Sequence, residues 1–145
     1  MTEVADISLR PARILIVDDA RDNRELLEVM LNWEGFVTQS AGSAEEALAI
    51  TMSDVPDLVL LDLALPGMNG CDLTLRLKAD AATKHLPIII VSGRGDAATR
   101  KRVQAAGATD FILKPIGRAD LSERVRSALL FAKAASPSAQ LRPSA

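Results

Sequence analysis

The sequence contains very little of the residue types on which many catalytic and metal centres depend. Among its 145 residues there is one cysteine, Cys71, and one histidine, His85. A single cysteine excludes an internal disulfide framework and a cysteine-rich zinc site. A single histidine excludes multi-histidine metal sites, and it leaves Ser-His or Cys-His catalysis only if His85 itself supplies the base. Several large classes of enzyme are thereby excluded.

Long apolar runs and an excess of charge of one sign are also missing. No stretch approaches the roughly 18 consecutive apolar residues of a membrane span, and residues 1–10 lack the basic-then-apolar order of a secretory signal. The net charge of −2 is too balanced for a chain built mainly to hold nucleic acid or anionic lipid. We therefore expect a cytoplasmic protein that binds neither nucleic acid nor membrane directly.

The composition that remains is typical of one globular domain. Apolar residues make up 48% of the chain and charged residues 25%, which is the balance of a folded protein of this length. We expect the domain to cover residues 12–133, after a flexible N-terminal segment at 1–11. Residues 134–145 are small, polar and proline-containing, which predicts a flexible tail.

Short apolar runs predict the strands of a sheet. The strongest cover residues 13–17, 58–61 and 88–91, and weaker candidates lie at 36–39 and 110–113. Runs that are apolar at every position suit strands buried on both faces, as in parallel sheets.

Helix-like segments separate these strands, at residues 22–33, 44–52, 71–79, 97–106 and 120–132. Ser43-Ala44-Glu45-Glu46 has the sequence of a capping box at the start of the second helix. The leucines at 73, 75 and 77 alternate as in a strand, but a parallel sheet needs a crossover there, so we predict a helix. Five strand–helix units in a row predict an α/β sheet covered by helices on both faces.

Polar side chains follow the predicted strands where each strand ends. Asp18 and Asp19 come after the first strand, Asp62 after the third, Ser92 after the fourth and Lys114 after the fifth. In open parallel sheets, ligands bind beyond the carboxyl ends of the strands, so these side chains should converge. For any one aspartate, a surface carboxylate that merely ends a strand is the simpler interpretation. The whole set in register favours a site.

Such a site would suit a divalent cation and a phosphoryl group. Clustered carboxylates repel each other unless a cation lies between them, and a set of oxygen ligands without His or Cys favours Mg²⁺. A lysine and a hydroxyl beside the metal would hold phosphoryl oxygens. A carboxylate can itself accept the phosphoryl group as an aspartyl phosphate.

These residues resemble the receiver domains of two-component response regulators. The matching motifs are Ile-Leu-Ile-Val-Asp-Asp at 14–19, Leu-Val-Leu-Leu-Asp-Leu-Ala-Leu-Pro-Gly-Met-Asn-Gly at 58–70, Pro-Ile-Ile-Ile-Val-Ser at 87–92 and Gly-Ala-Thr-Asp-Phe-Ile-Leu-Lys-Pro-Ile at 107–116. Each is weak alone, but all four in order at the family's spacings are specific. The resemblance covers roughly residues 12–133. It implies a doubly wound, flavodoxin-like sheet of five parallel strands in the order 2-1-3-4-5, with five helices on two faces.

The resemblance also implies the roles of the acidic residues. Asp62 would be the phosphoacceptor, and Asp18 and Asp19 would hold Mg²⁺ together with Asp62 and the backbone carbonyl of Ala64. The chain would catalyse its own phosphorylation and slow dephosphorylation without turning over a separate substrate.

The remaining roles concern the switch. Ser92 would bind a phosphoryl oxygen and move inward, Phe111 would turn with it, and Lys114 would pair with Asp62 and later with the phosphoryl group. The peptide bond before Pro115 would be cis. Some residues depart from the commonest family pattern: Ser92 replaces Thr and Phe111 replaces Tyr, Gly93 stands where Ala is usual, and Ala64 and Arg94 occupy positions that tune the phosphoryl lifetime.

The expected protein is a stand-alone response regulator. A histidine kinase or histidine phosphotransfer protein would donate the phosphoryl group, and a downstream protein would bind the helices at 97–106 and 120–132 and the strand between them. A homodimer through that surface is also possible. Basic residues gather there, either as an interaction surface or as an ordinary solvated face: Arg94, Arg100, Lys101, Arg102, Arg118, Arg124 and Arg126.

Other functions stay open. The chain could be a phosphate-relay intermediate, or a pseudo-receiver that binds partners without phosphorylation. A haloacid-dehalogenase-type phosphohydrolase is disfavoured, because such enzymes place a second aspartate two residues after the nucleophile, where this chain has Ala64. His85 is expected to be a surface residue and Cys71 a half-buried one.

Overall fold

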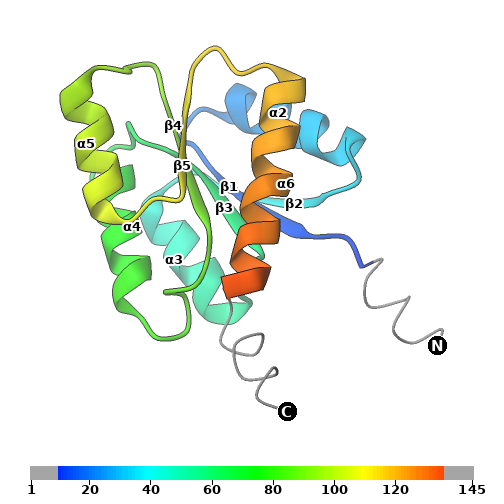
Figure 1. The fold of residues 1–145 in the computed structure, drawn as a ribbon, viewed down its shortest axis with the longest axis horizontal. Helices are drawn as coiled ribbons and strands as arrows, with labels where there is room; N and C mark the ends of the chain where they lie inside the picture. The colour runs from blue at the N-terminus through cyan, green and yellow to red at the C-terminus, as the bar shows by residue number, and fades with distance from the viewer. Residues whose placement is uncertain (1–9, 136–145) are drawn as a thin grey trace.

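The computed structural model describes residues 10–135 of the chain (Figure 1). The flexible segments predicted at 1–11 and 134–145 fall mostly outside this range. Strands and helices alternate along the described chain, in the order β1 Arg13–Val17, α2 Arg21–Trp33, β2 Val37–Ala41, α3 Ala44–Ser53, β3 Leu58–Asp62, α4 Gly70–Ala79, β4 Ile88–Ser92, α5 Ala97–Ala106, β5 Asp110–Leu113 and α6 Arg118–Ala135. No helix in this range is long and apolar enough to cross a membrane.

The five strands form one parallel sheet in the order β2-β1-β3-β4-β5, which confirms the predicted topology. β1 lies inside the sheet, with β2 on one side of it and β3, β4 and β5 following in order on the other. The ladders keep the strand ends level, since Val17 pairs with both Ala41 and Leu61, and Asp62 pairs with Val91. The carboxyl ends of the strands therefore share one edge of the sheet.

Helices cover both faces of the sheet, as predicted, and each face has its own core (Figure 1). Helices α3, α4 and α5 pack on the face that receives Leu15, Val17 and Leu61 from the strands. Helices α2 and α6 pack on the other face, over Ile14, Ile16 and Leu60. Because successive strand residues point to opposite faces, a run that is apolar at every position supplies both cores.

Helix α4 resolves the ambiguity of its alternating leucines. Leu73 and Leu77 are buried, one turn apart on the same face, whereas Leu75 is 54% exposed. The alternation is therefore accidental, and only the spacing of four residues reports burial. The helix starts with a complete capping box, in which Asn69 accepts a hydrogen bond from the Asp72 amide at 2.9 Å and the Asp72 carboxylate accepts one from the Asn69 amide.

The capping box predicted at Ser43 is formed in part. The Ser43 hydroxyl accepts a hydrogen bond from the Glu46 amide at 3.1 Å, as expected. The Glu46 carboxylate, however, accepts from the amide of Gly42 at 2.7 Å, one residue before the helix cap. Glu46 thus fixes the turn that leads into α3.

Two elements differ from the prediction by more than one residue at an end. The second strand is Val37–Ala41 instead of 36–39, because its pairing with β1 continues as far as Ala41. It is an edge strand with polar residues, so an apolar pattern does not show where it ends. The last helix is Arg118–Ala135 instead of 120–132, so it enters the first two residues of the predicted tail.

Candidate functional site

The predicted polar residues meet at the carboxyl edge of the sheet. Asp62 and Ser92 are the last residues of β3 and β4, while Asp18 and Lys114 directly follow β1 and β5. Their positions follow from the level ends of the parallel ladders. Asp18, Asp62 and Ser92 are buried, Lys114 is half-buried and Asp19 is exposed. The site is therefore a recess with one open side.

The three aspartates form a group that could hold a metal ion. One carboxylate oxygen from each of Asp18, Asp19 and Asp62 lies within 4.8 Å of the others. All of these donors are oxygens, which suits a hard cation such as Mg²⁺. The donor set therefore fits the ion that the sequence predicts.

Burial controls the charge of Asp62. Desolvation raises the pKa of its carboxyl group, and the neighbouring Asp18 carboxylate raises it further. Lys114 lowers the pKa through its charge and a contact of 3.5 Å between Nζ and Oδ2, and the Ala64 amide lowers it by donating to Oδ1 at 3.3 Å. The effects that raise the pKa of Asp62 outweigh those that lower it. A bound cation would favour the ionised form that a nucleophile requires.

The loop that carries Asp18 and Asp19 is held at several points. The amide of Asp18 donates to the carbonyl of Ala41 at 3.1 Å, and its carboxylate accepts from the amide of Ala20 at 2.9 Å. The Asp18 carbonyl accepts a hydrogen bond from Arg24, a residue in the second turn of α2, at 2.8 Å. The backbone around the two aspartates is thus fixed from β2 and from α2.

A glycine allows α4 to pack against the end of β3. A Cβ added at Gly70 would lie 2.7 Å from the carbonyl oxygen of Asp62 and 2.9 Å from Leu63 Cα. The Gly70 amide also donates to the Leu63 carbonyl at 3.0 Å. Because the close atoms belong to the backbone, only glycine fits here without moving the segment that carries Asp62.

Ser92 connects the site to the loop that follows β4. Its hydroxyl oxygen accepts a hydrogen bond from the amide of Arg94 at 3.0 Å. Further along, Arg100 Nε donates to the carbonyl of Gly95 at 3.0 Å, and its guanidinium carbon lies 4.6 Å from the centre of the Phe111 ring. One side chain of α5 therefore touches both this loop and β5.

Of the remaining predicted residues, Ala64 and Pro115 also lie at this edge. The Lys114–Pro115 peptide bond is cis. Ala64 is exposed and its amide faces Asp62. Phe111 is half-buried against the core under α3, α4 and α5. His85 is exposed, in keeping with a surface role, and Cys71 is buried rather than half-buried.

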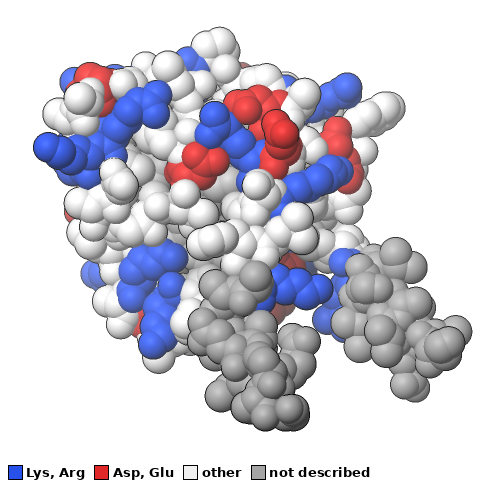
Figure 2. Space-filling model, viewed as in Figure 1, with Lys and Arg blue, Asp and Glu red and all other residues white. Residues whose placement is uncertain are grey.

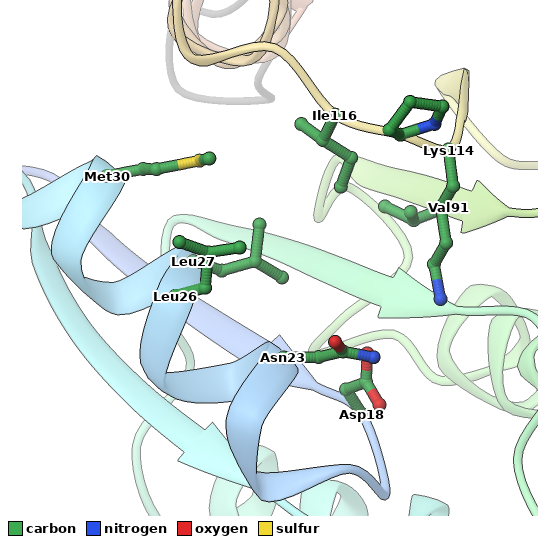
Figure 3. A pocket seen from close by; sticks show the side chains of 9 residues that line it. Asp18, Asn23, Leu26, Leu27, Met30, Val91, Lys114 and Ile116 are labelled. Carbon is green, nitrogen blue, oxygen red and sulfur yellow. The ribbon is translucent and has the colours of Figure 1, made fainter.

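A pocket of about 450 Å³ adjoins the acidic group. Asp18, Asn23 and Lys114 form its polar end, and Figure 3 shows the Lys114 amine directed toward Asp18 and Asn23 from the opposite wall. The rest of the lining is apolar and comes from α2, β4 and the segment after β5: Leu26, Leu27, Met30, Val91, Pro115 and Ile116. The site therefore opens onto an apolar hollow beside α2.

Most of the basic residues predicted to form a surface are already engaged within the molecule. Arg124 pairs with Asp110 at 2.9 Å and with Asp120 at 3.0 Å, and Arg126 pairs with Glu34 at 3.0 Å. In Figure 2, basic side chains gather over α5 and are mixed with acidic ones beside α6. The face is thus a charge-paired surface without a continuous basic stripe.

Arg24, Gly70 and Asn23 were not predicted as site residues. Arg24 and Gly70 act on backbone atoms of other segments, and no spacing in the sequence announces such contacts. Asn69-Gly70-Cys71-Asp72 does have the form of a capping sequence, and it is the one signal that could have located the start of α4.

Comparisons with known proteins agree with this geometry. A family model described as the response regulator receiver domain matches residues 14–126. The chain is 42% identical over 125 residues to the response regulator PleD of Caulobacter vibrioides, covering 83% of this chain and 26% of PleD. It is 41% identical over 117 residues to the DNA-binding response regulator MtrA of Mycobacterium tuberculosis, covering 81% of this chain and 50% of MtrA. The chain thus spans only a quarter to a half of these relatives.

A solved structure shows the same fold. The response regulator receiver domain protein of Methanospirillum hungatei superposes with a TM-score of 0.81 at 28% identity, and the match covers 88% of this chain and 100% of that one. The similarity therefore includes the whole sheet and its helices.

Proposed function

The chain belongs to the response regulator receiver domain family, and from this premise we propose that it is a phosphorylation switch with Asp62 as the phosphoacceptor. The observation that carries the proposal is the convergence of three carboxylates, one lysine and one hydroxyl at the carboxyl edge of the sheet.

The proposed reaction is the transfer of a phosphoryl group from a histidine of another protein. A carboxylate oxygen of Asp62 attacks phosphorus, the phosphorus–nitrogen bond breaks, and the electron pair returns to the donor imidazole. An acyl phosphate forms without any change in oxidation state. His85 is exposed and precedes β4, at the opposite end of that strand from Ser92, so the donor histidine is expected to come from a partner.

Asp18, Asp19 and Asp62 would hold Mg²⁺, and the backbone carbonyl of Ala64 is the further ligand that the family pattern implies. When bound, the ion would neutralise charge on the phosphoryl oxygens. Lys114 pairs with Asp62 in this structure, and after transfer its amine would pair with the phosphoryl group instead. The Ser92 hydroxyl would leave the Arg94 amide to bind a phosphoryl oxygen.

This exchange of hydrogen bonds would alter the surface of α5, β5 and α6. Movement of Ser92 frees the Arg94 amide, and the loop from residue 93 to 96 leads directly into α5. Arg100 links that loop to the Phe111 ring. A local change of charge at Asp62 would thereby favour one of two arrangements of loop and ring, which a partner can sense.

The partners we propose are a histidine kinase or histidine phosphotransfer protein as donor and a protein effector as target. The pocket beside α2 and the exposed Leu26 and Trp33 on the same helix support docking of a donor at the open side of the site. The mixed charge beside α6, with Arg124 paired to Asp110 and Asp120, supports a protein target and not nucleic acid (Figure 2). A homodimer, a cytoplasmic location, a stand-alone chain and a relay role stay predictions.

Phosphorylation can be tested by measuring the intact mass after incubation with Mg²⁺ and a small acyl-phosphate donor. We expect one phosphoryl group per chain in the wild type and none in Asp62→Asn. Asp54→Asn is the matched control, because Asp54 is exposed at the end of α3, where it pairs with Arg13 at the start of β1, away from the site. Labelling of Asp62→Asn would overturn the proposal. No labelling of the wild type, even with phosphohistidine donors, would favour a pseudo-receiver, and repeated release of phosphate from esters would favour a hydrolase.

A further inference from the structure

Arg24 contacts the backbone of the acidic loop and none of its carboxylates. Its Nη1 atom donates a hydrogen bond of 2.8 Å to the carbonyl oxygen of Asp18. That carbonyl belongs to the peptide unit that joins Asp18 to Asp19. The side chain is half-buried, and its own amide is part of α2, bonded to the Ala20 carbonyl at 3.1 Å. A rigid helix therefore holds the link between two candidate metal ligands.

The place of the guanidinium depends on a glycine. A Cβ added at Gly42 would lie 3.3 Å from Arg24 Nη1 and 3.8 Å from Cζ. The Gly42 backbone is itself fixed, because its amide donates to the Glu46 carboxylate at 2.7 Å. The fixed backbone of Gly42 thus lies directly beside the guanidinium of Arg24, and a side chain at position 42 would displace that guanidinium.

The other contacts of the loop do not fix the direction of the Asp19 side chain. Asp18 is fixed by its amide and by its carboxylate, but Asp19 is exposed, and no side-chain hydrogen bond of Asp19 is found within the described residues. The direction of Asp19 is therefore set mainly by the peptide that precedes it. Arg24 is the side chain that anchors this peptide.

We propose that Arg24 is a positioning residue, which holds the Asp18–Asp19 peptide so that both carboxylates are already placed for a divalent cation. The inference rests on the proposed function, since it concerns the same metal site. Arg24 touches neither the metal ligand atoms nor the reacting atoms, so its effect would pass through the geometry of the loop.

Electrostatics and positioning predict opposite effects of removing Arg24. A guanidinium near the site repels a cation, so charge alone predicts that Mg²⁺ binds more tightly without it. Positioning predicts weaker binding, because the cation must then order the loop. Fixing the backbone of one residue has an entropic cost that corresponds to about a tenfold loss of affinity. The sign of the change therefore separates the two explanations.

The test measures Mg²⁺ affinity by calorimetry for Arg24→Met and for Arg21→Met. Arg21 lies on the same helix and pairs with Glu25 on the surface, so its replacement removes an equal charge without touching Asp18. We expect binding about tenfold weaker in Arg24→Met. We expect unchanged or slightly tighter binding in Arg21→Met. Faster amide exchange at Asp19 and Ala20 should accompany the first change only.

Two further variants test the same proposal if Arg24→Met folds poorly. Gly42→Ala retains the charge and displaces the guanidinium, so it should also weaken Mg²⁺ binding, by a smaller factor. Arg24→Lys retains a cationic donor and should recover part of the affinity. The melting temperature in EDTA reports any general loss of stability in each variant.

The possible results are distinguishable. If Arg24→Met binds Mg²⁺ as tightly as the wild type or more tightly, the positioning role is wrong, while wild-type labelling at Asp62 still supports the proposed function. If the wild type binds no Mg²⁺ and takes up no phosphoryl group, both proposals are wrong. Weaker binding in Arg24→Met and Gly42→Ala, but not in Arg21→Met, supports the inference.

Discussion

Asp62 is held in an environment that opposes its own charge. Its carboxyl group is buried, faces Asp18 and is only partly compensated by Lys114 at 3.5 Å, so its pKa is raised. Ionised Asp62 is therefore less favourable in the folded chain than in the unfolded one. The same arrangement makes the group responsive, since a cation or a phosphoryl group at this place would change the balance of charge directly.

This environment predicts a pH-dependent penalty on stability in the absence of divalent ions. Because the folded pKa lies above the unfolded one, the folded chain binds more protons between them, and stability falls as pH rises through the folded pKa. Asp62→Asn removes the penalty. In EDTA we expect Asp62→Asn to melt at a higher temperature than the wild type at neutral pH, with the difference vanishing below the ordinary aspartate pKa of about 3.9.

Thermal melts of both proteins across this pH range measure the effect. A gain of about 1 kcal/mol would raise the melting temperature by a few degrees for a chain of this size. Mg²⁺ should raise the melting temperature of the wild type more than that of Asp62→Asn, because the variant lacks one of the three carboxylates that would bind the ion. A wild type that is as stable as the variant at every pH would contradict the prediction.

Gly70 sets the distance between α4 and the acceptor strand. Alanine normally stabilises a helix relative to glycine by about 0.4–1 kcal/mol. At Gly70 the added methyl group would lie 2.7 Å from a backbone oxygen, so we expect Gly70→Ala to destabilise the chain by about 1–3 kcal/mol and to slow labelling at Asp62. Gly93→Ala is the control, because its Cβ meets no atom within 4 Å. Equal stability of the two variants, measured by urea unfolding, would show that the contact is tolerated.

At the scale of the elements, the order and type of every described helix and strand could be predicted, but the ends of some of them could not. The runs at 14–17 and 58–61 are apolar at every position because both faces of those strands are buried. The edge strand β2 has polar residues on its exposed side, so its end at Ala41 is set by pairing with β1 and not by its own pattern. Pattern predicts burial, whereas pairing sets the boundaries.

Helix α4 shows where local pattern and topology disagree. Leu73, Leu75 and Leu77 alternate, and only the need for a crossover between parallel strands favoured a helix. The structure confirms the topological argument, since Leu75 is exposed and the other two are buried. The capping box at Asn69 and Asp72 is the local signal that agrees with it. An argument from connectivity was therefore stronger here than an argument from periodicity.

At the scale of the whole molecule, the candidate site is predictable because one rule of topology collects it. Residues that end parallel strands meet at one edge, so Asp18, Asp62, Ser92 and Lys114 could be placed together without coordinates. The contacts that support them could not. Arg24 donates a hydrogen bond to the carbonyl of Asp18, six residues earlier, and lies beside Gly42. No pattern in the sequence links these segments.

The path from the site to the outer surface also crosses separate elements. Ser92 ends β4, and the loop after it leads to α5. Arg100 of α5 donates a hydrogen bond to the Gly95 carbonyl in this loop and also lies over the Phe111 ring of β5. A cation over an aromatic face contributes about 0.5–1 kcal/mol at an exposed site. This is enough to couple the position of the loop to that of the ring, and too little to hold the fold together.

Arg100→Met should therefore uncouple β5 from the site while leaving phosphorylation intact. In the wild type we expect labelling at Asp62 to change hydrogen exchange both in the loop at 93–96 and in β5. In Arg100→Met we expect equal labelling and an unchanged response of the loop, but a response of β5 reduced by about half or more, given the size of the lost interaction. Lys101→Met is the control, because Lys101 is the exposed neighbour on α5 and only Arg100 lies over the ring. Exchange measured by mass spectrometry before and after labelling decides the matter, and an equal response of β5 in both variants would show that the signal does not pass through Arg100.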